Sequence, residues 1–321
     1  MAVYTKLARP DIERHLANYS IGSLVDFKEI IEGIDNSNFI LITTSGKFIL
    51  TIFEARIDKN QLPFFINFKL FLAKNGICCP CPVLDNQGSS IVDLQEKKST
   101  IVTFLSGATL KPQDDGYYSN ITAAHCYEVG KALAQLHLAA SGFNMQRENE
   151  LGIAGLRPLF SKFAGLVDDY QKNLGAEILM MIDFLEKSQK LDLPSAAVHL
   201  DLFPDNVFFD NSQKVSGIID FYFTANDALI YDFAIIINAW CFDENNIFSQ
   251  EKFDEMLKGY EELRKFSVEE LNFLKIALCA AALRFLLTRL HDLFFTPKNS
   301  LVKIKNPQEY LAKLNFFKLQ L

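Results

Sequence analysis

The first hundred residues alternate between polar turns and short runs rich in β-branched and aromatic residues. Residues 38–44 (NFILITT) and 47–53 (KFILTIF) are two such runs joined by a Ser-Gly pair, which predicts a β-hairpin. Further strands are predicted over residues 24–31, 90–94 and 99–105. Residues 61–75 carry apolar side chains at helical spacing and end in an Asn-Gly pair, so one helix is expected among the strands.

Beyond residue 106 the pattern changes to long helical stretches. Helices are predicted over residues 119–139, 159–173, 176–188, 231–240, 250–264, 268–293 and 307–319. A compact strand–loop–strand block over residues 197–221 interrupts them. The pattern indicates an α+β protein with a small β-rich lobe over residues 1–105 and a larger helical lobe over residues 106–321.

Composition narrows the class of protein. Nearly half of the 321 residues are apolar and 29 are Phe, so the chain can bury two sizeable cores. The formal net charge of −7 disfavours a nucleic-acid or membrane partner, which would need a concentrated basic face. The first residues lack the apolar core of a signal peptide, so a cytoplasmic location is expected. Composition leaves the oligomeric state open.

One late stretch, residues 271–295, is apolar enough to suggest a membrane span. It contains charged and polar side chains that lipid would disfavour: Lys275, Arg284, Arg289, His291 and Asp292. We therefore expect a buried helix there.

The block at residues 199–221 carries the clearest chemistry. His199 and Asp201 follow a short apolar strand, Asn206 comes five residues after Asp201, and a second strand ends in Asp220 and Phe221. This order and spacing match the kinase signature H-x-D, then N, then D-F. Phosphoryl transfer needs a carboxylate beside the attacking hydroxyl and oxygen ligands for a bridging metal. We predict that Asp201 is the catalytic carboxylate and that Asn206 and Asp220 bind Mg²⁺.

His199 is placed in the catalytic group with a supporting role. An ordinary aspartate, with a pKa of about 3.9, is a weak base at neutral pH. Asp201 is therefore expected to orient the hydroxyl and to accept its proton late in the transfer, while His199 braces the loop. An isolated Asp and Asn on a turn would indicate only turn structure, but the histidine, both strands and the second aspartate favour a kinase site.

The catalytic block resembles that of the aminoglycoside phosphotransferase and choline kinase superfamily, which has a protein-kinase-like bilobal fold. Further stretches resemble one branch, the type II homoserine kinases: MAVYT, EGIDNSNF, ILTIFE, LPFF, GLRPLF, HLDLFPDNVFF, IIDFYF, YDFAI and NAWCF. The match extends from the first residue to about residue 295. It implies phosphorylation of the L-homoserine hydroxyl with ATP, a step in threonine synthesis.

In such folds the loop after the first strand covers the phosphates of ATP through its backbone N–H groups. The corresponding candidates here are Gly33, Asn36, Ser37 and Asn38. A plain β-turn remains the alternative from these residues alone. Adenine is expected against backbone groups of the hinge, at Thr103, Phe104 and Leu105.

The strand lysine that reaches the phosphates in most relatives is missing. Thr51 stands at that position, and the helix over residues 61–75 has no glutamate to pair with a lysine. Thr51 is assigned to the nucleotide site. Another cation, such as Lys47, Arg56 or Lys59, or additional metal, must balance the phosphate charge.

Homoserine carries an ammonium and a carboxylate, so its pocket needs an acid and a cluster of donors. Arg157 and Arg284 are candidates for the carboxylate, because a guanidinium matches its geometry. Asp205 and Asp232 are candidates for the ammonium. Each has a structural alternative: Arg157 bracing a loop, Arg284 pairing inside the helical bundle, and Asp232 capping a helix.

Two other functions are weighed against this one. The acceptor could be an amino alcohol, a sugar or an aminoglycoside, although the C-terminal helices lack the concentration of carboxylates that an aminoglycoside site needs. The second alternative function is that of a nucleotide-binding pseudokinase scaffold, which only the missing strand lysine supports.

Overall fold

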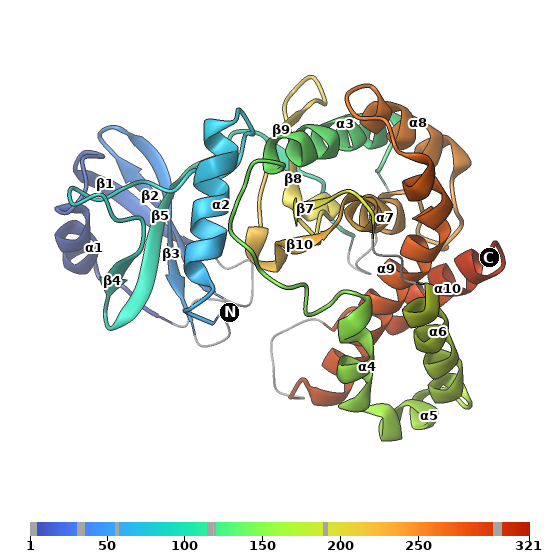
Figure 1. Cartoon of the computed structure of the whole chain (residues 1–321). Coiled ribbons are helices and arrows are strands. Elements are labelled where there is room, and N and C mark those ends of the chain that lie inside the picture. The colour runs from blue at the N-terminus through green and yellow to red at the C-terminus, as the bar shows by residue number, and fades with distance from the viewer. Residues whose placement is uncertain are drawn as a thin grey trace. The chain divides into compact units, whose positions relative to one another are not determined.

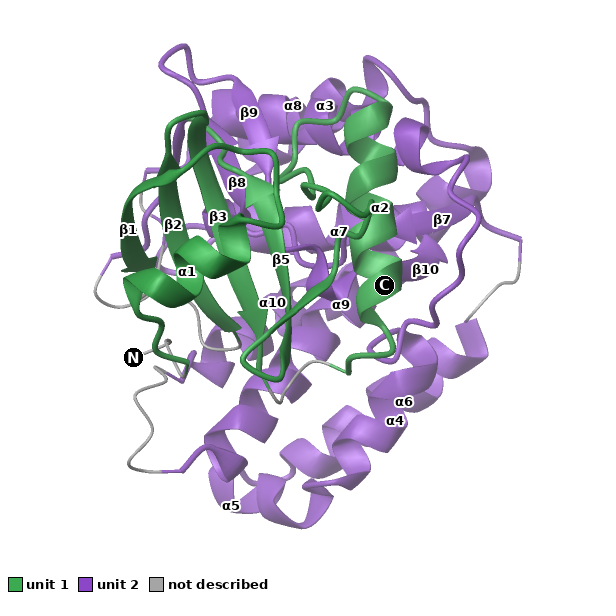
Figure 2. Ribbon diagram, turned by 90° about the vertical axis from the view of Figure 1, so that its left-hand side faces the viewer, with its two compact units in different colours: residues 1–106 green, residues 107–321 purple. Residues whose placement is uncertain are grey.

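The structure, a computed structural model, describes residues 5–30, 36–54, 58–113, 118, 120–188, 192–297 and 304–321. The chain divides into two compact units, residues 1–106 and 107–321 (Figure 2). This division lies one residue from the boundary expected from the change in hydrophobic pattern. Unit 1 contains an antiparallel sheet and unit 2 is mainly helical, which confirms the α+β class (Figure 1).

Unit 1 is built on a five-stranded antiparallel sheet of order β1-β2-β3-β5-β4. Its strands are β1 (Leu24–Ile30), β2 (Asn36–Thr43), β3 (Gly46–Phe53), β4 (Val92–Leu94) and β5 (Lys97–Thr103). The predicted hairpin is β2–β3, in which Phe39 lies opposite Leu50. Both side chains are fully buried, in a cluster that also contains Leu16 of helix α1 (Arg9–Leu16). The hydrophobic pattern did not predict α1. The predicted helix is α2 (Leu62–Lys74).

Unit 2 has a wholly buried helix at its centre. Every residue of α7 (Leu229–Trp240) is buried. Around it are α3 (Ala123–Ala140), α8 (Gln250–Glu261), α9 (Val268–Phe295) and α10 (Pro307–Lys318). Helix α9 is long and apolar enough to cross a membrane, but 72% of its most apolar window is buried inside the unit. It is a core helix, as its charged residues predicted.

The predicted helix over residues 159–173 is wrong in its bounds. The structure has α4 (Ile153–Ser161), a 3₁₀ turn (Ala164–Leu166) and the short α5 (Val167–Tyr170), followed by α6 (Leu174–Ser188). The break occurs at Phe163, whose φ of −142° is not helical. Because Phe163 is buried, burial of its ring outweighs the continuity suggested by the apolar pattern.

Short strands frame the catalytic block in unit 2. Strand β7 (Ser195–Val198) pairs with β10 (Ala225–Ala228), and a second small sheet contains β6 (Ala108–Thr109), β8 (Val207–Phe209) and β9 (Val215–Ile218). The loop between β7 and β8 therefore has both ends fixed by sheet hydrogen bonds.

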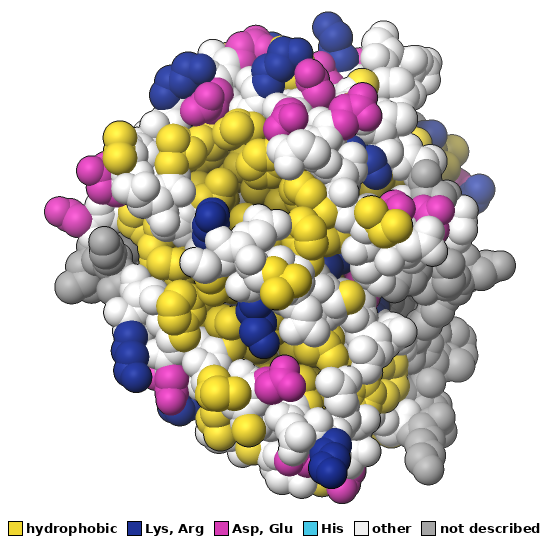
Figure 3. All heavy atoms as spheres, turned by 90° about the vertical axis from the view of Figure 1, so that its right-hand side faces the viewer, with side chains coloured by type: hydrophobic (Ala, Val, Ile, Leu, Met, Phe, Trp, Pro, Cys, Tyr) yellow, Lys and Arg dark blue, Asp and Glu magenta, His cyan; other side chains and the backbone are white. Residues whose placement is uncertain are grey.

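One face of the molecule exposes a broad area of hydrophobic side chains bordered by charged ones (Figure 3).

Helices α3 and α8 approach closely because each has a glycine at the contact. A Cβ atom built on Gly130 would lie 2.1 Å from the backbone oxygen of Met256, and one on Gly259 would lie 2.0 Å from that of Tyr127. Backbone oxygens cannot rotate away, so only glycine allows this separation.

We predict that Gly259→Ala destabilises the protein. Alanine favours the helix by about 1 kcal/mol, but forcing the helices apart costs about 1–3 kcal/mol or more, so the net effect is a loss of stability. Thermal unfolding followed by circular dichroism would measure it. Gly165→Ala is the matched control, because no atom lies within 4 Å of its Cβ position. Equal melting temperatures for the two variants would contradict the prediction.

Candidate active site

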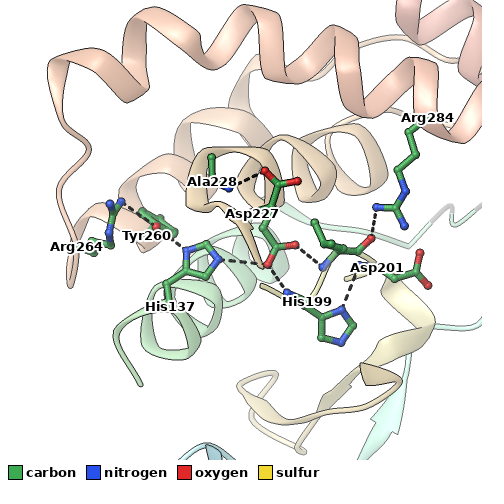
Figure 4. A network of polar contacts seen from close by, with 10 residues as sticks. His137, His199, Asp201, Asp227, Ala228, Tyr260, Arg264 and Arg284 are labelled. Atoms are coloured by element: carbon green, nitrogen blue, oxygen red, sulfur yellow. Dashed lines mark hydrogen bonds and ion pairs between the residues drawn. The ribbon is translucent and has the colours of Figure 1, made fainter. Parts of the chain in front are cut away.

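The loop between β7 and β8 is held in a strained conformation. Leu200 has a φ of 65°, a left-handed conformation that is rare for a leucine. Its N–H donates to Asp232 Oδ1 (2.8 Å), and its carbonyl accepts from Arg284 Nη1 (2.5 Å). The N–H of His199 donates to the other oxygen of Asp232 (2.8 Å) (Figure 4). Such strain costs on the order of 1–3 kcal/mol and persists only where its surroundings enforce it.

Asp232 lies beneath this loop, at the start of α7. Its carboxylate is fully buried and also contacts His137 Nε2 (3.2 Å). Burial would raise its pKa, but the hydrogen bonds from His137 and the backbone lower it, so the carboxylate stays ionised. The prediction that Asp232 binds the substrate ammonium is therefore corrected. Both oxygens are occupied inside the protein, and Asp232 positions the loop.

His199 braces Asp201, as expected. Its ring is fully buried. Nδ1 accepts the N–H of Asp201 (3.2 Å), so Nε2 carries the proton and donates it to the carbonyl of Ile219 (2.9 Å). Burial lowers the pKa of His199 and favours this neutral form. Both ring nitrogens are used, so His199 has a positioning role: it links the loop after β7 to the end of β9.

Asp201 follows the strained peptide and is partly buried. Burial raises its pKa to about 6, against the opposing positive charges of Arg284 and Lys305. This pKa is higher than that of the ordinary aspartate expected from the sequence, so the carboxylate is a better proton acceptor than expected. It is still mostly ionised at neutral pH.

Asn206 and Asp220 stand where oxygen ligands for a metal are expected. The amide nitrogen of Asn206 donates to the carbonyl of Asp201 (2.8 Å), which leaves its oxygen Oδ1 available. Asp220 is exposed and has a φ of 65°. Within the described ranges no group of three or more His, Cys, Asp or Glu residues is placed to hold a metal. One amide oxygen and one carboxylate nevertheless suit Mg²⁺, which is commonly held by one or two carboxylates together with substrate phosphates.

Arg284 reaches the same loop from α9 (Figure 4). Its side chain is almost fully buried, with the guanidinium carbon 4.6 Å from the centre of the Phe285 ring and 5.6 Å from that of Phe223. Only Nη1 has a hydrogen-bond acceptor among the residues that the structure describes, and buried Nε has none. The remaining N–H groups are available to an anionic ligand.

Asp205 lies one turn beyond Asp201 and is half-buried. The hydroxyl of Tyr118 donates to it, and burial together with the negative charge of Asp205 raises the pKa of Tyr118. Asp205 therefore stays a candidate for the acceptor ammonium. Sequence reasoning missed Tyr118, because its position in a connecting segment carries no motif.

Arg157 is not part of this site. It lies on α4 and donates to Asp183 (2.6 Å) and Glu186 (2.9 and 2.7 Å) of α6. These ion pairs are at the surface of the helical unit. The predicted contact with substrate is replaced by the bracing role that the sequence left as the alternative.

The nucleotide candidates of unit 1 lie on β2 and β3, except that Gly33 falls outside the described residues. Asn38 Oδ1 accepts from the Thr51 hydroxyl (2.8 Å), and the N–H of Glu54 donates to Asn36 Oδ1 (3.4 Å). The Ser37 hydroxyl donates to Glu54 (2.7 Å). These bonds connect β2 with β3 and with Glu54.

Glu54 is the centre of this polar cluster and was missed by the sequence analysis. It is buried at the end of β3 and receives hydrogen bonds from Thr5 (2.7 Å), Ser37 (2.7 Å) and Lys97. Burial would raise its pKa, but these donors lower it. Lys97 is therefore paired with Glu54 and is a poor candidate for the missing phosphate cation.

The hinge candidates are at the end of β5. Thr103 exchanges hydrogen bonds with Cys81: its N–H donates to the Cys81 carbonyl (2.9 Å), and its hydroxyl accepts from the Cys81 N–H (3.0 Å). Phe104 is exposed, with Lys47 Nζ 5.6 Å from the centre of its ring, and Leu105 is half-buried. Of the alternative phosphate cations, Lys47 thus lies near the hinge and Arg56 falls outside the described residues.

The fold and this arrangement of side chains around the loop between β7 and β8 define a phosphotransferase of the kinase-like class. Residues 26–266 match the model of the phosphotransferase enzyme family. Over 98–99% of its length, the chain is 42% identical to a homoserine kinase of Rhizobium meliloti and 45% identical to one of Bartonella henselae, covering 94% and 97% of them. The chain belongs to the phosphotransferase enzyme family, and the resemblance to homoserine kinases is confirmed.

A solved structure supports the fold independently. Amicoumacin kinase hAmiN, determined with AMP-PNP and Ca²⁺, superimposes with a TM-score of 0.68 at 14% identity, over 98% of this chain and 93% of that one. This similarity confirms the kinase-like bilobal fold class.

We predict that Asp201→Asn stabilises the metal-free protein above pH 6 while lowering kcat by about 10²–10⁴. The folded state raises the pKa of Asp201 from 3.8 to about 6, so it binds this proton more tightly than the unfolded chain does. The resulting stability is complete below about pH 4 and is lost as the pH rises through 6. Asparagine avoids that loss.

Melting temperatures measured from pH 5 to pH 8 with chelator present test this. The gain of the variant should grow from pH 5 to about pH 7, where it reaches several degrees, and then level off. Asp254→Asn, on the exposed surface of α8, should show no such trend. A gain that does not depend on pH would refute the raised pKa.

Proposed function

We propose that this protein transfers the γ-phosphoryl group of ATP to the hydroxyl of L-homoserine. The observation that carries the proposal is the 41–45% identity to homoserine kinases over nearly the whole chain. Similarity at this level extends through both the β-rich and the helical units. The phosphorylated amino acid would serve threonine synthesis in the cytoplasm.

The site residues support this reaction step by step. The hydroxyl of the acceptor lies against the Asp201 carboxylate, which orients one oxygen lone pair toward the γ-phosphorus. As the new O–P bond forms and the bond from the γ-phosphorus to the bridging oxygen breaks, the hydroxyl proton passes to Asp201 and ADP leaves. A pKa near 6 suits this late acceptance better than an ordinary aspartate would.

A divalent metal and a nucleotide complete the site. Asn206 Oδ1 and the Asp220 carboxylate would hold the metal, and Mg²⁺ is the ion we propose. When bound, it neutralises phosphate charge and aligns the β- and γ-phosphates. The hAmiN structure contains AMP-PNP and Ca²⁺, which supports a nucleotide and a divalent ion in this fold. Backbone groups around Asn36–Asn38 and Thr103–Leu105 are proposed to contact ATP.

The charged ends of homoserine are proposed to meet Arg284 and Asp205. Arg284 is buried beside Asp201 with donors to spare, and its planar fork matches a carboxylate. Asp205, held by Tyr118, offers a carboxylate to the ammonium. A pocket arranged in this way rejects acceptors that leave either group unpaired.

We predict that L-homoserine is a much better acceptor than 4-hydroxybutyrate, which lacks the ammonium, or 3-amino-1-propanol, which lacks the carboxylate. Each loss leaves a charged side chain of the pocket unpaired and should lower kcat/KM by up to about 10⁴. A coupled assay of ADP release across these acceptors, choline and kanamycin measures the ratios.

Arg157→Ala is a control variant and should keep the KM for homoserine, because its ion pairs lie on α4 and α6. Preference for choline or kanamycin, or equal use of homoserine and 3-amino-1-propanol, would disprove the proposed acceptor.

We predict that Asp220→Asn raises the Mg²⁺ concentration needed for half-maximal activity by at least about tenfold. Asparagine tolerates the left-handed backbone at this position but removes the negative charge that attracts the ion. Titration of Mg²⁺ at fixed ATP would show the shift. Asp254→Asn on exposed α8 is the control. An unchanged requirement in Asp220→Asn would place the metal elsewhere.

A further inference from the structure

Lys305 presents a positive charge beside the catalytic loop. Its Nζ lies 5.1 Å from the centre of the Phe203 ring. Phe203 is two residues beyond Asp201, and its N–H donates to the carbonyl of Asp201 (2.9 Å). The lysine thus rests on a side chain whose backbone is tied to the catalytic residue.

The backbone next to Lys305 is firmly anchored. The carbonyl of Asn306 accepts from Arg289 of α9 (2.8 Å), and its side chain caps α10 by accepting the N–H of Gln308 (3.0 Å). Pro307 is buried. The backbone that follows Lys305 is therefore anchored, and the Lys305 side chain is exposed.

The neighbouring charges are already paired with one another. Glu309 accepts from Arg289 (2.5 Å) and from Lys313 (2.5 Å), and all three are largely buried. Lys305 takes no part in this network, and the structure gives it no carboxylate partner among the residues it describes. A cation positioned beside a ring without a counterion is suited to an anionic ligand.

A row of aromatic contacts connects Lys305 with Arg284. The rings of Phe203 and Phe285 meet edge to face with centres 5.0 Å apart, and the Arg284 guanidinium lies 4.6 Å from the centre of the Phe285 ring. The positive charges of Lys305 and Arg284 both act on Asp201. Arg284 donates through Nη1 to the carbonyl of Leu200, so Nε and Nη2 are the donors that remain for a ligand.

We propose that Lys305 is a specificity residue that, together with Arg284, binds the carboxylate of the amino-acid acceptor. The inference rests on the proposed function and deepens it. Arg284 supplies the buried half of a two-cation site, and Lys305 supplies the half that is open to solvent. The assignment explains why a lysine without a counterion is held next to the catalytic loop.

The test compares the unmodified enzyme with Lys305→Met and Lys305→Arg, using L-homoserine and L-homoserinamide, whose neutral amide replaces the carboxylate. Lys305→Met should raise the KM for homoserine about tenfold with little change in kcat or in the KM for ATP. Its kcat/KM for homoserinamide should equal that of the unmodified enzyme. Lys305→Arg should retain most of the affinity, and added salt should weaken homoserine binding less in Lys305→Met.

Lys318→Met is the matched control, because Lys318 ends α10 and pairs with Glu177. An unchanged KM for homoserine in Lys305→Met overturns the inference while leaving the proposed function intact. So does an equal loss of kcat with both acceptors, which would mean that the charge acts on the transferred phosphoryl group. Failure of the unmodified enzyme to phosphorylate homoserine overturns the proposed function and the inference together.

Discussion

The catalytic loop depends on one buried carboxylate. Asp232 accepts the N–H groups of His199 and Leu200 in succession, which holds a leucine in a left-handed conformation that it would otherwise leave. Arg284 holds the carbonyl of the same residue. An ionised carboxylate without exposure needs several donors, and the two N–H groups together with His137 supply them. The direction of Asp201 follows, because it is the next residue along the chain.

A chain of hydrogen bonds extends this constraint across the helical unit (Figure 4). A guanidinium can only donate and an ionised carboxylate can only accept, which fixes the direction of the bonds at the two ends of this chain. Arg264 donates to the Tyr260 hydroxyl (3.1 Å), the hydroxyl is hydrogen-bonded to His137 Nδ1 (2.8 Å), and His137 Nε2 donates to Asp232. Trp240 adds a second anchor by donating to the carbonyl of Leu202 (2.9 Å), so α7 holds the loop at both ends of the strained segment.

Sequence reasoning succeeded where the determining interactions are local. The β2–β3 hairpin follows from alternating residues around a tight turn, and the spacing of Asp201, Asn206 and Asp220 follows from one loop and one hairpin. It failed where partners distant in sequence decide the role. Asp232 was predicted to bind the substrate ammonium, but its carboxylate is buried under a loop that lies 32 residues earlier in the sequence. Arg157 was predicted to bind the substrate carboxylate, but it pairs with carboxylates of α6. The break at Phe163 depends likewise on packing, which periodicity does not record.

At position 51 a threonine stands where a phosphate-binding lysine was expected, so other groups must balance the phosphate charge. The Thr51 hydroxyl donates to Asn38, a neutral contact that steadies two strands but cannot balance a phosphate. Lys97, on the neighbouring strand β5, is paired with Glu54. Under the proposed function, the charge on ATP is therefore balanced mainly by the metal that Asn206 and Asp220 are proposed to bind. On this proposal phosphate binding depends on the metal, because without the ion the negative charge of Asp220 would repel the nucleotide.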